Sequence, residues 1–186
     1  MQNSKLVKIM RTLDKGEFKY LGWFVKSDYF NTDKNLVRLY RVLGRHYPEF
    51  ENKGLERGAV FGKVFPGTEY SDIKMRNLMS KMTKTVERYL IILELEKEPM
   101  ERDKLLVKSY GRRNLYEYFE KNTNNLISGL GEKSIKHPIA LIERLLLSHN
   151  YYYHPQTSKV NCFDILQIMM EDLDAWYFSE KLQLAS

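Results

Sequence analysis

The sequence has few of the residues that interrupt or cross-link a chain. Cys162 is its single cysteine, which excludes an internal disulfide framework and makes a reducing, cytoplasmic environment the expectation. Only five prolines occur in 186 residues, and no glycine follows Gly131. Between these breakers the apolar residues recur at helical spacing, and no stretch alternates with a period of two between hairpin turns. A β-sheet is therefore not expected.

Long apolar runs are also absent. A helix that crosses a bilayer needs about 18 or more consecutive apolar residues, and the nearest approach, residues 90–95, is short and contains a glutamate. The first residues lack the apolar segment of a signal peptide, so we expect no membrane partner. The apolar fraction of 43% is ordinary for a folded protein, and wholesale disorder is not expected either.

The positive charge is concentrated in the first half of the chain. Residues 1–97 contain 19 Lys and Arg against 12 Asp and Glu, whereas residues 98–186 contain 11 against 12. Such an asymmetry indicates an acidic partner for the first half, and nucleic acid is the commonest acidic partner. The alternative is a solvated basic surface that only aids solubility.

Capping residues and breakers divide the first half into five predicted helices. Asp14 and Glu17 have the spacing of a capping box at the start of the second helix. Asp33 precedes the third helix. Ser71 caps a long fifth helix, which ends before Pro99 because proline disfavours helical geometry in the residue before it.

After Pro99 the pattern changes to two predicted helical pairs. These are residues 99–111 with 114–128, and residues 138–152 with 158–184. We therefore predict an all-α protein with two domains. A basic helical bundle, residues 1–98, leads into a repeat-like and solenoid-like region of stacked helical pairs, residues 99–186.

No constellation of catalytic or metal-binding residues is apparent. The histidines include no pair at the spacing of a metal-binding helix, and no cysteine pair completes a zinc site with His149 and His154. Residues 129–134 resemble a phosphate loop but have the wrong spacing, and we interpret them as a helix end and loop. Cys162 has no histidine offered as its base. We expect no enzyme activity, no metal and no cofactor.

Residues 55–95 resemble a helix-turn-helix unit, with a short helix, a turn and the long helix. Apolar side chains from Met75 to Leu93 share one face of the long helix, within an arc of about 120°. Nearly opposite lies a polar stripe, within an arc of about 80°, whose side chains suit phosphates and base edges. The stripe consists of Lys74, Asn77, Lys81, Lys84 and Arg88. The other interpretation is an ordinary solvated face of a basic protein.

Aromatic residues cluster near residues 20–30, 151–153 and 176–178. Aromatics interleaved with cations can stack on single-stranded nucleic acid. Consecutive residues on a helix face different directions, however, so packing in a core or an interface is the favoured interpretation.

The last predicted helix has neither a polar outer face nor a glycine stop. We expect it to pack on further residues, on a second copy of the chain or on a partner. The expected contact residues are Trp176, Tyr177 and Leu182.

Three phrases of the sequence together resemble a known group of proteins. They are residues 27–31 (SDYFN), residues 64–72 (VFPGTEYSD) with 76–80 (RNLMS), and residues 173–182 (LDAWYFSEKL). They resemble the amino-terminal part of a group of uncharacterised, all-helical bacterial proteins that are usually longer than this chain. The resemblance implies a helical, solenoid-like continuation and no known catalytic residue. Residues 71–81 separately resemble the recognition helix of bacterial winged-helix regulators, although residues 89–98 offer no turn for a wing.

Two functions remain as hypotheses. The first is a cytoplasmic, non-catalytic interaction or scaffold module that binds a protein partner, or a second copy of itself, through the last helix. The alternative is a nucleic-acid-binding, regulator-like protein that uses residues 71–88.

Overall fold

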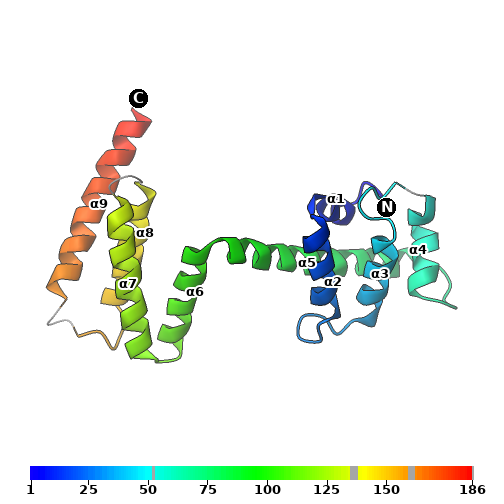
Figure 1. The fold of residues 1–186 in the computed structure, drawn as a ribbon, viewed down its shortest axis with the longest axis horizontal. Helices are drawn as coiled ribbons and strands as arrows, with labels where there is room; N and C mark the ends of the chain where they lie inside the picture. The colour runs from blue at the N-terminus through cyan, green and yellow to red at the C-terminus, as the bar shows by residue number, and fades with distance from the viewer. Residues whose placement is uncertain (52, 135–137, 159–161, 186) are drawn as a thin grey trace. The chain divides into compact units, whose positions relative to one another are not determined.

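The computed structural model describes residues 1–51, 53–134, 138–158 and 162–185. The secondary structure within these ranges consists of helices, with no strands, which confirms the predicted all-α fold class (Figure 1). The helices are α1 (Lys5–Thr12), α2 (Lys15–Lys26), α3 (Lys34–Gly44), α4 (Arg57–Val64), α5 (Asp72–Lys97), α6 (Pro99–Arg112), α7 (Tyr116–Ser134), α8 (Ile139–Tyr152) and α9 (Phe163–Leu184).

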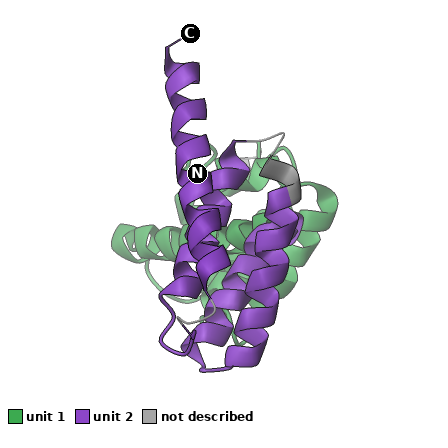
Figure 2. Cartoon of the chain, turned by 90° about the vertical axis from the view of Figure 1, so that its left-hand side faces the viewer, with its two compact units in different colours: residues 1–94 green, residues 95–186 purple. Residues whose placement is uncertain are grey.

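The chain forms two compact units, Met1–Glu94 and Leu95–Ser186 (Figure 2). The division falls inside the last turn of α5, shortly before the boundary at residue 98 that the sequence suggested. Each unit has its own buried side chains.

The helix starts of the first unit are fixed by side-chain caps. The Asp14 carboxylate accepts a hydrogen bond from the Glu17 backbone N–H at 2.8 Å, and the Glu17 carboxylate accepts one from the Asp14 N–H at 3.1 Å. Asp33 caps α3, and the Ser71 hydroxyl accepts from the backbone of Lys74 at 3.4 Å. Caps of this kind typically stabilise a helix by about 1 kcal/mol. All three predicted helix starts are confirmed.

The core of the first unit is made from one apolar face of each helix. α2 packs against α3, and α3 packs against α4. The face of α5 that the spacing predicted is buried, including Met75, Leu78, Met82, Val86 and Tyr89. The polar stripe on the opposite side of α5 is consequently left at the surface.

The connection between α4 and α5 is a turn in which Gly67 has a φ of 74°. Glycine adopts this left-handed conformation without the steric cost that a Cβ would bring. α5 then continues as one helix to Lys97, and no wing hairpin follows it in the part of the chain that the structure describes. The unit therefore has the short helix, turn and long helix that the sequence suggested, without a wing.

In the second unit the helices α6 to α9 run up and down, and each packs beside the next (Figure 1). Two small clusters hold them together. One contains Val107, Phe119, Tyr151 and Cys162, and the other contains Ile127, Leu130, Ala140 and Leu147. This arrangement matches the predicted stacking of helical pairs.

Two predicted helix bounds in the second unit were wrong. α9 begins at Phe163 and not at residue 158. α7 does not end near residue 128 but continues through Gly131 to Ser134. The glycine leaves room for a side chain of α8, because a Cβ at Gly131 would lie 2.5 Å from Nη1 of Arg144. Gly131, which the sequence suggested as a helix end, instead marks a site where α7 and α8 approach each other closely.

Candidate interaction surfaces

The polar stripe of α5 lies entirely at the surface of the first unit. All five of its side chains are exposed, as binding to phosphates or base edges requires. The five residues are Lys74, Asn77, Lys81, Lys84 and Arg88. Exposure alone is equally consistent with a solvated face, so the role of the stripe stays a prediction.

Two of the four cations in the stripe already have partners within the unit. Lys81 donates to the Asp33 carboxylate at 3.2 Å, and the Arg88 guanidinium lies 5.0 Å from the ring centroid of Phe30. Exposed contacts of these kinds are worth about 1 kcal/mol or less, so phosphates could replace them. Lys74 and Lys84 have no carboxylate within ion-pair distance among the described residues. Two of the four cations would therefore give up a weak partner on contacting phosphates, and the other two would not.

A row of apolar side chains runs along the outside of α9 in the second unit. From Phe163 to Tyr177 its members follow one another at alternating intervals of three and four residues, and Leu184 extends the row by two more turns. The outer row consists of Phe163, Leu166, Met170, Leu173, Tyr177 and Leu184. Phe163 is 77% exposed and Met170 is 69% exposed, whereas Leu166 is half-buried. The three-four spacing continues from Tyr177 to position 180, which is Glu180, so the row is interrupted there before Leu184.

The three contact residues predicted for the last helix do not form one surface. Tyr177 belongs to the outer row, whereas Trp176 is half-buried. Leu182 is exposed but lies about 140° around the helix from Tyr177. The C-terminal end of α9 projects past the ends of α7 and α8 (Figures 1 and 2). Most of the outer row is not among the predicted contact residues, although its three-four spacing is present in the sequence. The role of Trp176, Tyr177 and Leu182 in binding a partner stays a prediction.

Carboxylates line one edge of the outer row. Asp164, Glu171 and Asp174 are all exposed, and Lys181 is the one exposed cation among the residues of α9. The side-chain amide of Gln167 donates to Glu171 at 2.8 Å. The face that α9 presents is therefore apolar along its centre and acidic along one side.

The opposite side of α9 is held against α8 by a buried ion pair. Arg144 donates from Nε to Oδ2 of Asp172 at 2.8 Å and from Nη2 to Oδ1 of the same carboxylate. The hydrogen bonds to Asp172 raise the pKa of Arg144 above its ordinary value. Asp172 is fully buried, unlike its neighbours Glu171 and Asp174, which are exposed. The pair fixes which face of α9 points outward.

α8 carries a second, sparser row of exposed apolar side chains. Ile139, Leu146 and Tyr153 recur at intervals of seven residues and are each more than half exposed. His149 packs on Tyr153, with ring centroids 4.5 Å apart. This row has one exposed apolar side chain in every seven residues, whereas the outer row of α9 has two apolar side chains in the same length.

The polar groups in the interior of the second unit have structural partners. Tyr151 donates to the Glu120 carboxylate at 2.6 Å, and burial together with this hydrogen bond raises the pKa of Tyr151. His154 stacks on Phe119 with a centroid distance of 4.3 Å. Among the described residues, no three His, Cys, Asp or Glu side chains come together as a metal site. In the same ranges, no helix is both long enough and apolar enough to cross a bilayer.

Comparison with known proteins gives no further guide to function, because no family model, curated protein or solved structure matches this chain. The resemblances noted in the sequence therefore stay predictions. Any function has to be argued from the surfaces themselves.

Proposed function

We propose that the chain is a non-catalytic helical interaction module that binds an amphipathic helix of a protein partner along α9. The observation that carries the proposal is the outer row, an exposed apolar seam on a helix whose opposite face is already packed. Exposed apolar side chains that form a contiguous strip commonly mark interaction sites.

The spacing of the outer row specifies the shape of the partner. Alternating intervals of three and four residues are the repeat through which two helices pack side by side, each side chain entering a hole on the other helix. From Phe163 to Tyr177 the seam is about 21 Å long at 1.5 Å per residue. A helix of four or so turns covers it, whereas an extended segment would match only alternate positions.

The charge beside the seam specifies the partner's chemistry. Asp174 lies at a flanking position of the seam, and Glu171 and Asp164 lie further round the same side of α9. A partner with Lys or Arg near these carboxylates gains attraction, whereas a second copy of α9 offers a single cation, Lys181, to the three carboxylates. We therefore favour a different protein with a basic flank over self-association.

The proposal includes a cytoplasmic location and the absence of catalysis. A single, buried cysteine is compatible with a reducing compartment. Tyr151 and Asp172, two buried groups of the second unit that could act as an acid or a base, are occupied in hydrogen bonds. Nucleic-acid binding through the α5 stripe is the alternative function, supported by the exposure of Lys74 and Lys84.

Two designed helical peptides test the proposal. Both have three heptads with Leu at the seam positions, and they differ only in carrying Lys or Glu at the flanking positions. Each is labelled with fluorescein and titrated with the whole chain while anisotropy is recorded. The matched variants are Met170→Gln/Leu173→Gln/Tyr177→Gln, which removes the centre of the outer row, and Ile73→Gln/Ile91→Gln, which removes exposed apolar groups of α5.

The proposal predicts that the Lys peptide binds at least about tenfold more tightly than the Glu peptide. The α9 triple variant weakens that binding at least about tenfold, and the α5 double variant leaves it unchanged. Failure of the Lys peptide to bind, or equal binding of both peptides, contradicts the proposal. If sedimentation velocity shows a dimer that the α9 triple variant abolishes, the molecule bound along α9 is a second copy of the chain and not a different protein.

A further inference from the structure

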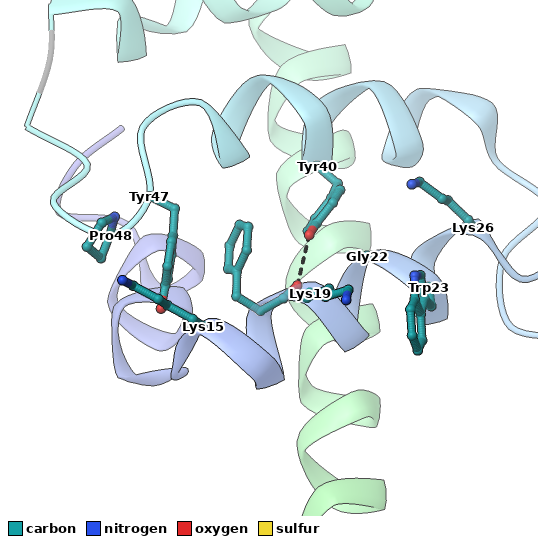
Figure 3. Close-up of a pocket in the computed structure, with 9 residues that line it drawn as sticks. Lys15, Lys19, Gly22, Trp23, Lys26, Tyr40, Tyr47 and Pro48 are labelled. Carbon is teal, nitrogen blue, oxygen red and sulfur yellow. Dashed lines mark hydrogen bonds between the residues drawn. The ribbon is translucent and has the colours of Figure 1, made fainter.

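A groove on the first unit lies between α2 on one side and α3 with the residues that follow it on the other. Its volume is about 410 Å³, and Tyr40, Tyr47 and Pro48 face α2 across it (Figure 3). The Tyr40 hydroxyl donates to the Phe18 carbonyl at 2.8 Å, and the Phe18 ring stacks on Tyr40 and Tyr47 at centroid distances of 5.2 and 4.0 Å. The aromatic wall is thus fixed by packing before any ligand arrives.

Three lysines of α2 line the other side of the groove. Lys15, Lys19 and Lys26 fall on one face of the helix, within an arc of about 40°. Lys15 lies at the end near Pro48, and Lys26 lies toward the other end (Figure 3). All three are exposed, and no described carboxylate lies within ion-pair distance of their ammonium groups. Unpaired cations gathered on one groove attract an anion.

Trp23 adds an exposed aromatic surface to the same helix face. It lies one turn after Lys19, is 57% exposed and lines the groove. The Lys19 ammonium lies 5.4 Å from the centroid of the Trp23 ring. The ring of Tyr20, which is 51% exposed, lies 5.0 Å from the Trp23 ring, centroid to centroid. An exposed tryptophan beside cations contributes little to the core but offers a surface on which a flat ring can stack.

We infer that this groove binds a nucleobase together with its phosphate group. The base stacks on Trp23 and displaces Lys19, whose ammonium then pairs with the phosphate. Stacking on an aromatic side chain is worth about 1–3 kcal/mol per base, which exceeds the roughly 0.5–1 kcal/mol of an exposed cation–π contact. Lys15 and Lys26 extend the positive potential along the groove for neighbouring phosphates. The ligand's source is either a free nucleotide or a single strand of nucleic acid.

The arrangement fits this ligand better than an acidic peptide or a lipid surface. Carboxylates would pair with the lysines but leave the exposed Trp23 without a role. A helix that lies in a bilayer surface buries its apolar face in lipid, whereas the apolar face of α2 is already in the core of the unit through Phe18, Leu21 and Val25. The inference is independent of the α9 seam and of the α5 stripe.

Fluorescence anisotropy with three probes tests the inference on the whole chain. The probes are a fluorescein-labelled ten-nucleotide thymidine strand, unlabelled AMP as its competitor, and vesicles of phosphatidylserine in phosphatidylcholine. The variants are Trp23→Ala and Lys19→Ala, with Lys63→Ala on α4 as the matched control for an exposed lysine outside the groove. Circular dichroism checks that each variant keeps its helix content.

The expected result is binding of the strand that Trp23→Ala weakens about tenfold and Lys63→Ala does not change. Lys19→Ala lowers the slope of log affinity against log salt by about 0.7, the value for one phosphate contact on a single strand. If millimolar AMP displaces the strand, a free nucleotide is sufficient as the ligand. If AMP does not displace it, the ligand is the strand. No binding of the strand or AMP, binding that ignores Trp23→Ala, or vesicle binding without strand binding overturns the inference.

Discussion

Arg144 and Asp172 face each other as a two-point ion pair between α8 and α9, and the Asp172 carboxylate has no exposed surface. Removing one partner of a buried pair leaves the other charge without compensation in a medium of low polarity. The pair therefore does more than attach α9, since it makes other rotational settings of that helix unfavourable. The outer row is exposed because its opposite face carries this contact.

Asp172→Ala is expected to lower the free energy of unfolding of the second unit by about 3–5 kcal/mol. Asp174→Ala, which removes an exposed carboxylate two residues away, is expected to change it by less than about 0.5 kcal/mol. Urea denaturation followed by Trp176 fluorescence in a Trp23→Phe background measures both. Similar effects of the two substitutions would show that the ion pair does not hold α9.

Tyr89 gives the first unit a pH dependence at alkaline pH. Burial, with the charges of Glu17 and Asp14 adding to it, raises the pKa of Tyr89 from 10.0 to about 12, and its hydroxyl donates to the Glu17 carbonyl at 2.7 Å. The folded state thus favours the neutral phenol, so its stabilisation is complete below pH 10 and lost as pH rises toward 12. Wild type should lose up to about 2–3 kcal/mol more than Tyr89→Phe across this window in denaturant titrations. Parallel pH profiles for the two proteins would contradict this.

Two glycines in helices of the first unit should respond oppositely to alanine. A Cβ at Gly22 would lie 2.6 Å from the Tyr40 hydroxyl, while nothing lies within 4 Å of a Cβ at Gly62. We expect Gly22→Ala to destabilise the unit by about 1–3 kcal/mol through overpacking, and Gly62→Ala to stabilise it by about 0.5–1 kcal/mol through helix propensity. Thermal unfolding measures both changes. Stabilisation by Gly22→Ala would mean that Tyr40 is free to move aside.

Salt dependence separates the proposed function from duplex binding by α5. If the four cations of the stripe contact phosphates, the slope of log affinity against log salt is about −3.6, and affinity falls about 150-fold between roughly 50 and 200 mM salt. Lys81→Ala alone then reduces the slope by about one. The proposed function predicts weak duplex binding that Lys74→Ala, Lys81→Ala and Arg88→Ala together hardly change. Tight binding that this triple variant abolishes would favour the alternative.

The local chemistry of the chain made much of the fold predictable. Capping pairs such as Asp14 with Glu17 act within one turn, so their outcome is visible in the sequence. Gly131 was misinterpreted because its role depends on Arg144, which approaches from another helix. The partial pairing of the α5 stripe was hidden for the same reason, since Asp33 is remote from Lys81 along the chain.

The candidate surfaces were harder to predict than the fold. The apolar residues of α9 and the early aromatic cluster can be identified in the sequence. Which of them stay exposed depends on how the helices pack. Phe24 is in the core, whereas Trp23 beside it is at the surface. The spacing of Lys15, Lys19, Trp23 and Lys26 on one face of α2 was a signal available in the sequence, and it gained meaning only once the wall formed by Tyr40 and Tyr47 was in place.

Hydrogen–deuterium exchange on the whole chain, with and without a saturating amount of the Lys-flanked helical peptide, shows which helix binds the peptide. The proposed function predicts slower exchange across residues 163–177 of α9 when the peptide is present, and unchanged exchange in α2 and α5. Protection that appears in α2 or α5 instead, or α9 exchange that the peptide does not alter, would contradict it.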